Sequence, residues 1–190
     1  MRSENFESTG SVRYLRAFLS AQDATNLFAW LTTPANVVWQ REKFPIFGRE
    51  VEAPRQLAWF GNANLNYRYT GIDHFTEGWP DELDRLRDVI CHEAHHPFNF
   101  VLLNRYANGN EYMGWHRDDE RGAGSCIASL SLGATRRFRW RQGAGMASEF
   151  LDLEAGSLLL FDGRLQHTLT KTKRATGERI NLTFRMIDAY

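Results

Sequence analysis

Cysteine is scarce in this sequence of 190 residues, which contains only Cys91 and Cys126. Two cysteines are too few for a disulfide framework, so we expect a reducing compartment: the cytoplasm, or the nucleus if the organism is a eukaryote. The first ten residues, MRSENFESTG, lack the charged and then apolar pattern of a secretory signal peptide. No apolar run approaches the roughly 20 residues that a membrane helix needs, so no membrane association is expected.

The chain also lacks an excess of charge, since 23 Lys and Arg residues balance 23 Asp and Glu residues. This balance excludes a protein that attracts nucleic acid over its whole surface, and any phosphate binding requires a local basic patch. Hydrophobic residues make up 43% of the sequence, which is enough for one substantial core. We predict a single domain over residues 1–190, present as a monomer.

Helical periodicity is confined to the first half of the chain. Apolar residues recur at helical spacing over residues 15–19 and 27–31, which predicts two early helices, with Ser20 and Asp23 as caps between them. Residues 80–93 predict a third helix, because acidic residues follow the proline at its start and the apolar residues share one face.

From Phe98 onward, short β-rich runs alternate with turn signals. Their spacing of about 8 to 12 residues is typical of closed or double-sheet all-β architectures. A jelly roll fits this pattern best, so the whole chain is predicted to be α+β.

Residues 92–96, HEAHH, match the H-E-x-x-H pattern of zinc metalloproteases. That site requires His92 and His96 one turn apart on a continuous helix, so that both rings reach one ion. Pro97 disfavours helical backbone at His96, which places the pattern on a fraying helix end. We therefore favour the alternative, in which these are polar side chains near a helix C-terminus, where the helix dipole stabilises cations.

A second metal site is predicted from the sequence WHRDDE. His116 and Asp118 are two residues apart and lie on the same side of an extended chain. His167, on a later β segment after a turn that contains glycine, is available as a third ligand. Two histidines and one carboxylate form the facial triad of non-haem Fe(II) oxygenases, although a zinc hydrolase can use the same ligands.

The final strand, RINLTFR, favours the oxygenase. One of its faces is polar and carries Arg179, Asn181, Thr183 and Arg185. If this face points into the barrel, its two arginines can bind a small dicarboxylate beside the metal, helped by Asn104 and Tyr106 from another strand. The alternative is an ordinary edge strand whose polar face is exposed to solvent.

Five segments in this order, FNFVLLNRYANG, WHRDDE, GSLLLF, His167 and RINLTFR, resemble the AlkB family of Fe(II)- and 2-oxoglutarate-dependent nucleic-acid dealkylases. The likeness is greatest to the homologues that repair duplex DNA. It implies a double-stranded β-helix, or jelly-roll, core over about residues 98–188, N-terminal helices, and a nucleotide-recognition lid over about residues 40–75.

The resemblance also implies a role for each polar residue of the two predicted sites. His116, Asp118 and His167 would bind Fe(II). The residues that would hold the cosubstrate 2-oxoglutarate are Asn104, Tyr106, Arg179, Asn181, Thr183 and Arg185. Arg179 would pair with the distal carboxylate, and Arg185 would lie toward the end that chelates iron. Dioxygen, the second cosubstrate, would be consumed in the reaction.

Substrate contacts are implied at three places. Ile46, Phe47 and Gly48 would form a finger that probes the duplex, and Tyr67, Arg68 and Tyr69 would contact the extruded base. Asp119 and Glu120 would favour a cationic base through their charge. The alternatives are core packing for the tyrosines and for Phe47, and solvated loop positions for the acids. Basic residues that could contact phosphates, or form a solvated basic face, are Arg136, Arg137, Arg139, Arg141, Lys171, Lys173 and Arg174.

The function implied by the resemblance is oxidative demethylation of N1-methyladenine or N3-methylcytosine in alkylated DNA, single- or double-stranded. RNA is a second candidate substrate. Formaldehyde, succinate and CO2 would be released by this direct-reversal repair. Two alternatives are a 2-oxoglutarate oxygenase that acts on protein or a small molecule, and a noncatalytic reader of modified nucleic acid.

Overall fold

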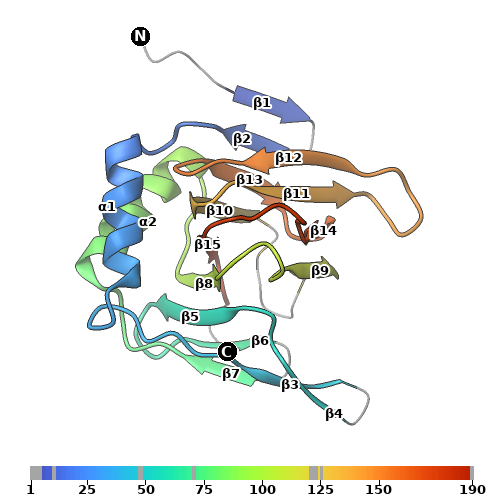
Figure 1. Cartoon of the computed structure of the whole chain (residues 1–190). Coiled ribbons are helices and arrows are strands. Elements are labelled where there is room, and N and C mark those ends of the chain that lie inside the picture. The colour runs from blue at the N-terminus through green and yellow to red at the C-terminus, as the bar shows by residue number, and fades with distance from the viewer. Residues whose placement is uncertain are drawn as a thin grey trace.

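The structure is a computed structural model that describes residues 6–9, 12–46, 49–69, 72–119, 124 and 126–188. Most of its regular elements are strands, and they form two main sheets and two separate hairpins (Figure 1). Neither helix in the described residues is long and apolar enough to cross a membrane.

The larger sheet has seven strands, each antiparallel to its neighbours. In spatial order they are β1 (Phe6–Thr9), β2 (Val12–Leu15), β13 (Leu158–Asp162), β10 (Cys126–Gly133), β15 (Arg179–Arg185), β8 (Phe100–Tyr106) and β5 (Gln56–Gly61). β15 lies between β10 and β8, so both of its edges are hydrogen-bonded. The edge-strand alternative for RINLTFR is therefore wrong.

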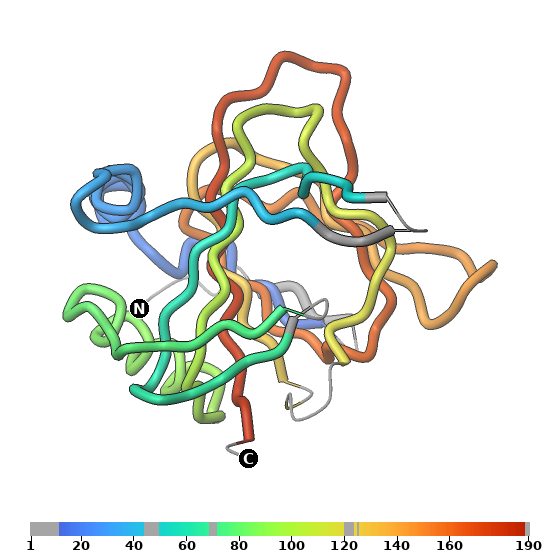
Figure 2. Tube along the Cα trace, turned by 90° about the horizontal axis from the view of Figure 1, so that it is seen from below, coloured from blue at the N-terminus to red at the C-terminus, as the bar shows by residue number. Residues whose placement is uncertain are grey.

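The smaller sheet has four strands: β12 (Glu149–Leu153), β11 (Arg136–Arg141), β14 (Gln166–Leu169) and β9 (Met113–His116). Its inward side chains pack against the larger sheet, since Phe138 and Trp140 share a buried cluster with Ile127 and Phe161. Seen from below, β8 and β15 lie on one side of a common centre, and β9 and β14 on the other (Figure 2). The predicted jelly roll is confirmed.

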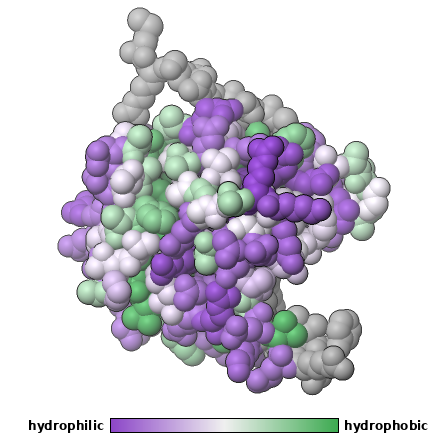
Figure 3. Space-filling view, in the orientation of Figure 1, coloured by the Kyte–Doolittle hydropathy of each residue, from purple (hydrophilic) through white to green (hydrophobic). Residues whose placement is uncertain are grey.

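Two helices cover the outer face of the larger sheet (Figure 1). α1 (Ala21–Thr32) and α2 (Asp81–Ala94) bury Leu31, Leu83 and Ile90 against Leu130 and Leu182 of the sheet. On the face that Figure 3 shows, hydrophobic residues gather on the side where the helices lie, and hydrophilic residues predominate over the smaller sheet. The helices therefore occupy the outer face of the larger sheet, and its other face is turned toward the smaller sheet.

The N-terminal part differs from the prediction of two early helices. Ser20 caps α1 as expected, because its hydroxyl accepts a hydrogen bond from the backbone N–H of Asp23 at 3.1 Å. The first predicted helix is absent from residues 12–19, where the chain forms β2 and a turn. The apolar run there is too short for its period to separate helix from strand, and pairing of β2 with β13 decides the outcome.

The HEAHH segment does not form a zincin site. α2 ends at Ala94, and His95 follows it in the left-handed conformation with φ of 49°. His92 and His96 therefore do not share a continuous helix. This outcome agrees with the expected helix end before Pro97.

The remaining strands form two hairpins beside β5. One consists of β3 (Lys43–Ile46) and β4 (Arg49–Glu52), and the other of β6 (Asn66–Tyr69) and β7 (Ile72–Phe75). Both hairpins, together with β5, fall within the segment predicted as a recognition lid.

The centre of the larger sheet should be sensitive to loss of volume. We predict that Leu182→Ala lowers the free energy of unfolding by about 2–5 kcal/mol, because this side chain is fully buried and its loss leaves a cavity. Val89→Ala on the exposed face of α2, where 54% of Val89 is accessible, should cost under about 0.5 kcal/mol. Urea denaturation of both variants measures the difference, and equal losses would contradict this account of the core.

Candidate active site

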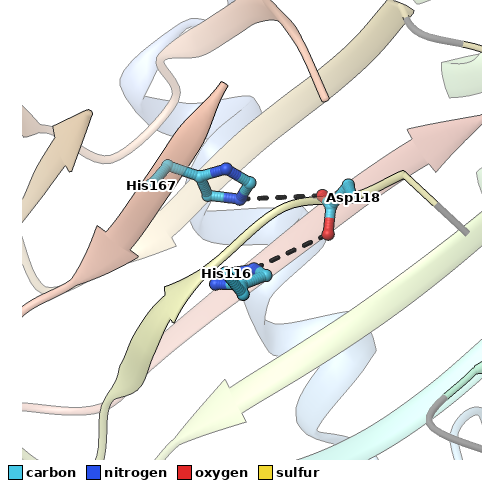
Figure 4. A group of neighbouring side chains, drawn as sticks. All are labelled: His116, Asp118 and His167. Carbon is cyan, nitrogen blue, oxygen red and sulfur yellow. Dashed lines mark ion pairs between the residues drawn. The ribbon is translucent and has the colours of Figure 1, made fainter. Parts of the chain in front are cut away.

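The predicted metal ligands come together between the two sheets. His116 at the end of β9 and His167 in β14 are paired across neighbouring strands, and Asp118 follows two residues after His116. The Nε2 atoms of His116 and His167 lie 3.6 and 3.7 Å from the two Asp118 carboxylate oxygens (Figure 4). The three ligand atoms lie within 4.8 Å of one another, as a single metal ion requires, and this is the one such group among the described residues.

The backbone selects the histidine tautomer that can bind a metal. The Nδ1 atom of His116 contacts the carbonyl of Gly114 at 2.8 Å, and Nδ1 of His167 contacts the carbonyl of Leu165 at 2.9 Å. A carbonyl oxygen only accepts, so each Nδ1 carries the proton and donates it. The Nε2 lone pairs consequently point toward Asp118 and are available to a metal ion.

Asp118 is a buried carboxylate whose charge is held by Arg185. The Arg185 Nη2 atom donates to Asp118 Oδ2 at 2.9 Å, and both side chains are nearly inaccessible to solvent. Burial by itself raises the pKa of Asp118, but its interactions with Arg185, His167 and His116 outweigh burial and lower the pKa below its usual value. The site therefore contains an anionic ligand at neutral pH.

His167 lies in an apolar environment between the rings of Phe138 and Phe161, at centroid distances of 5.4 and 4.9 Å. Burial lowers the pKa of His167 to about 4, against the opposing effect of Asp118. Its imidazole is thus neutral at physiological pH, which is the form that binds metals.

Gly163 makes room for Asp118 and was not singled out from the sequence. Its carbonyl accepts from the backbone N–H of Asp118 at 2.8 Å, and a Cβ at this position would lie 2.6 Å from the carbonyl oxygen of Asp118. The Cβ of any other residue would therefore displace the backbone of Asp118. The glycine in the sequence DGR before His167 was the available signal, but it was interpreted only as part of a turn.

The polar faces of β15 and β8 line the same pocket as the three metal ligands. The residues predicted to hold the cosubstrate all contribute to its wall: Asn104, Tyr106, Arg179, Asn181, Thr183 and Arg185. Because β8 and β15 are paired with Asn181 opposite Asn104, and Arg179 opposite Tyr106, their polar side chains form one continuous surface.

Arg179 provides the strongest indication of an anionic ligand. It is 2% exposed, and burial lowers its pKa to about 10. Its Nη2 donates to the hydroxyl of Ser131 at 2.9 Å, whereas its buried Nε has no hydrogen-bond partner and no carboxylate of the described residues pairs with it. A buried cation without a counterion is unfavourable, so the pocket fits a ligand that brings a carboxylate to this end.

Two amide side chains are oriented by hydrogen bonds within the chain, and the partners Arg55 and Ser129 were not predicted from the sequence. Arg55 is buried, and its Nε donates to Oδ1 of Asn104 at 2.6 Å, which leaves the amide nitrogen of Asn104 for another partner. The Asn181 amide donates to Ser129 Oγ and to the Leu130 carbonyl, and its oxygen accepts from Thr183. In this structure Asn181 therefore braces β15 against β10.

The predicted substrate residues are more scattered. Tyr67 is 1% exposed and packs on Phe100, as in the packing alternative, while its hydroxyl accepts from Arg185 at 3.0 Å. Arg68 is exposed and pairs with Asp73 at 2.8 Å.

The other predicted substrate residues are less well defined. Asp119 is exposed beside Asp118. Ile46 and Tyr69 are strand residues of β3 and β6, and Phe47, Gly48 and Glu120 lie outside the described residues.

The predicted basic residues do not form a uniform patch. Arg136 is buried and donates to backbone carbonyls, including those of Glu111 and Thr170. Arg137 on the outer face of β11 is paired with Asp152 and so is partly neutralised. Arg141 and Lys171 lie over aromatic rings, those of Trp115 and Tyr112 at 4.1 and 4.3 Å.

A jelly roll with two histidines and an aspartate beside a buried, cationic pocket defines a non-haem metal oxygenase. Residues 11–185 match the 2OG-Fe(II) oxygenase superfamily, for which Fe(II) and 2-oxoglutarate are the groups that the triad and the pocket fit. The chain belongs to this superfamily and, within it, to the AlkB family.

Curated relatives agree with this membership, and a solved structure shares the fold. The DNA oxidative demethylase ALKBH2 of Mus musculus is 38% identical over 159 residues, which cover 76% of this chain and 66% of the relative. The alpha-ketoglutarate-dependent dioxygenase alkB homolog 3 of Bos taurus is 32% identical over 186 residues, 90% of this chain and 64% of the relative. The chain thus spans less than two thirds of these relatives. The structure of OsALKBH1 has the same fold, with a TM-score of 0.67, 16% identity, and coverage of 95% of this chain and 99% of that one.

The close contact at Gly163 predicts a loss of metal affinity in a variant that leaves every ligand in place. Gly163→Ala should weaken metal binding by about 10- to 100-fold, because the added methyl group displaces Asp118. Gly143→Ala, whose Cβ meets only the Met146 sulfur at 3.6 Å, is the matched control. Calorimetric titration with Mn(II) measures both, and equal affinities would show that Gly163 does not position the ligand.

Proposed function

We propose that this protein removes methyl groups oxidatively from N1-methyladenine and N3-methylcytosine in DNA, with RNA as a second substrate. The observation that carries the proposal is the pocket in which the three metal ligands adjoin the buried, unpaired Nε of Arg179. The AlkB relatives support the choice of substrate, since one is named a DNA oxidative demethylase. The protein is proposed to act as a monomer, in the cytoplasm or in the nucleus of a eukaryote.

The cosubstrate is expected to lie along β15 with its two ends at different arginines. Arg179 pairs with the distal carboxylate at the end near Ser131, and Arg185 lies at the end near Asp118. Tyr106 and the amide nitrogen of Asn104 add neutral hydrogen bonds from β8. This orientation directs the 2-oxo acid end toward His116, Asp118 and His167.

Fe(II) and 2-oxoglutarate, when bound, supply the oxidation by dioxygen: the cosubstrate is converted to succinate and CO2, and the N-methyl group is hydroxylated. The hydroxymethyl product then releases formaldehyde and the repaired base. The protein residues bind and orient the reactants. His116, Asp118 and His167 would hold the metal; the side chains of His167 and Asp118 are shielded from water, whereas that of His116 is 26% exposed.

The base must leave the duplex stack before its methyl group reaches the metal. The proposed lid, which contains the β3–β4 and β6–β7 hairpins, provides the finger of Ile46, Phe47 and Gly48 and the strand that carries Tyr67, Arg68 and Tyr69. Exposed Asp119, with Glu120 beside it in sequence, would favour a base that methylation has made cationic. A preference for a cationic methylated base would distinguish this protein from an oxygenase that acts on proteins or small molecules.

Mass spectrometry of an oligonucleotide with one N1-methyladenine tests this function. With Fe(II), ascorbate and 2-oxoglutarate, the oligonucleotide should lose the mass of one methylene group, in single-stranded and duplex forms tested in parallel. Asp118→Ala should abolish the loss, because it removes the anionic metal ligand. Asp88→Ala, which changes an exposed acid of α2 on the outer side of the larger sheet, is the matched control and should retain activity.

Loss of methylene without added 2-oxoglutarate, or undiminished activity of Asp118→Ala, would contradict the assignment. Metal-dependent succinate formation without any change in the oligonucleotide would retain the oxygenase and reject DNA as its substrate.

A further inference from the structure

A buried acid–base pair joins the two hairpins of the proposed lid. His74 of β7 is fully buried, and its Nε2 lies 2.6 Å from Oε1 of Glu42, whose side chain is 8% exposed. The His74 Nδ1 contacts the Tyr67 carbonyl at 3.2 Å and must donate to it, because a carbonyl only accepts. One proton therefore lies between Nε2 of His74 and the Glu42 carboxyl group.

Glu42 stands at the base of the β3–β4 hairpin. Its carbonyl accepts from the backbone N–H of Ala53 at 2.7 Å, just beyond β4, so the residue closes this hairpin. The second carboxyl oxygen of Glu42 is buried and has no hydrogen-bond partner among the described residues. The contact with His74 therefore accounts for a buried carboxyl group at this position.

Among the described residues, the two hairpins belong to different sheets. β3 pairs with β4 and β6 pairs with β7, each as a two-stranded sheet of its own. An isolated two-stranded hairpin is marginally stable in water and depends on side-chain packing. A buried polar contact between the hairpins is accordingly well placed to fix their relative position.

The same network continues to the metal ligands. His74 is opposite Tyr67 in the β6–β7 ladder, and the Tyr67 hydroxyl accepts from Nη1 of Arg185 at 3.0 Å. Nη2 of Arg185 in turn donates to Asp118 at 2.9 Å. Trp59 of β5 packs edge-on against His74 at 4.4 Å, which holds the imidazole from the other side.

We propose that Glu42 and His74 are positioning residues that clip the β3–β4 hairpin to the β6–β7 hairpin. Both hairpins are thereby held as one lid, in a fixed position relative to the metal site. Neither residue contacts the reacting atoms. Their effect on the reaction is exerted through the hairpins that bind the nucleic acid, and to that extent the inference rests on the proposed function. The clip itself is a property of the folded chain and can be tested without any substrate.

Hydrogen exchange tests the clip in the protein without nucleic acid. Glu42→Ala should accelerate exchange of the amides in β3 and β7 by about tenfold, because the hairpins then open independently, while β15 remains protected. Glu52→Ala is the matched control, since this exposed acid lies opposite Lys43 at the base of the same hairpin. Glu42→Gln can still donate a hydrogen bond to Nε2 of His74 and should restore protection.

If Glu42→Ala does not fold, His74→Phe takes its place, because it preserves a ring against Trp59 and removes the polar contacts to Glu42 and to the Tyr67 carbonyl. Exchange equal to that of Glu52→Ala in β3 and β7 would overturn the inference, whatever the activity.

The activity then distinguishes a positioning role from a purely structural one. The KM for methylated DNA should rise by about tenfold in Glu42→Ala, while the KM for 2-oxoglutarate and its turnover without DNA stay within about twofold of wild type. A parallel rise in both KM values would overturn the inference. If wild-type protein forms succinate but leaves DNA unchanged, the proposed function fails, and the exchange experiment alone still decides the clip.

Discussion

The ion pair between Arg185 and Asp118 is the interaction on which the rest of the site depends. One buried guanidinium stabilises the anionic metal ligand and, through its other nitrogen, holds the hydroxyl of Tyr67. Separating such a buried pair would leave an uncompensated charge, at a cost of about 3–5 kcal/mol. Asp118, β15 and the β6–β7 hairpin are consequently linked by a single side chain.

The jelly roll explains why these groups meet although they are far apart in sequence. β15 is central in the larger sheet, so its alternate residues face the smaller sheet, where β9 and β14 present His116 and His167. The close approach permitted by Gly163 brings the chain after β9 into contact with the turn before β14. Rigid strands, rather than loops, thus position the two histidines and both arginines, as preorganised sites require.

Much of this could be predicted from the sequence, because strand alternation and ligand identity are local signals. The spacing of His116 and Asp118 and the alternation in RINLTFR indicated the metal site and the cationic wall. The prediction of a helix over residues 15–19 was wrong. The few apolar residues around Leu15 fit the period of a helix or of a strand, and long-range pairing of β2 with β13 decides between them. Arg55, Gly163 and the Glu42–His74 pair were missed, because their roles depend on contacts between segments that no local pattern encodes.

The central claim is that Arg179 is a buried cation whose partner is the distal carboxylate of the cosubstrate. Calorimetry of metal-loaded protein without oxygen tests it with 2-oxoglutarate and with 2-oxobutanoate, which lacks that carboxylate. Arg179→Gln should weaken binding of 2-oxoglutarate by about 30-fold or more and change binding of 2-oxobutanoate little, since only the first ligand loses a buried charge pair. Equal effects on both ligands, or none on 2-oxoglutarate, would contradict this account of the pocket.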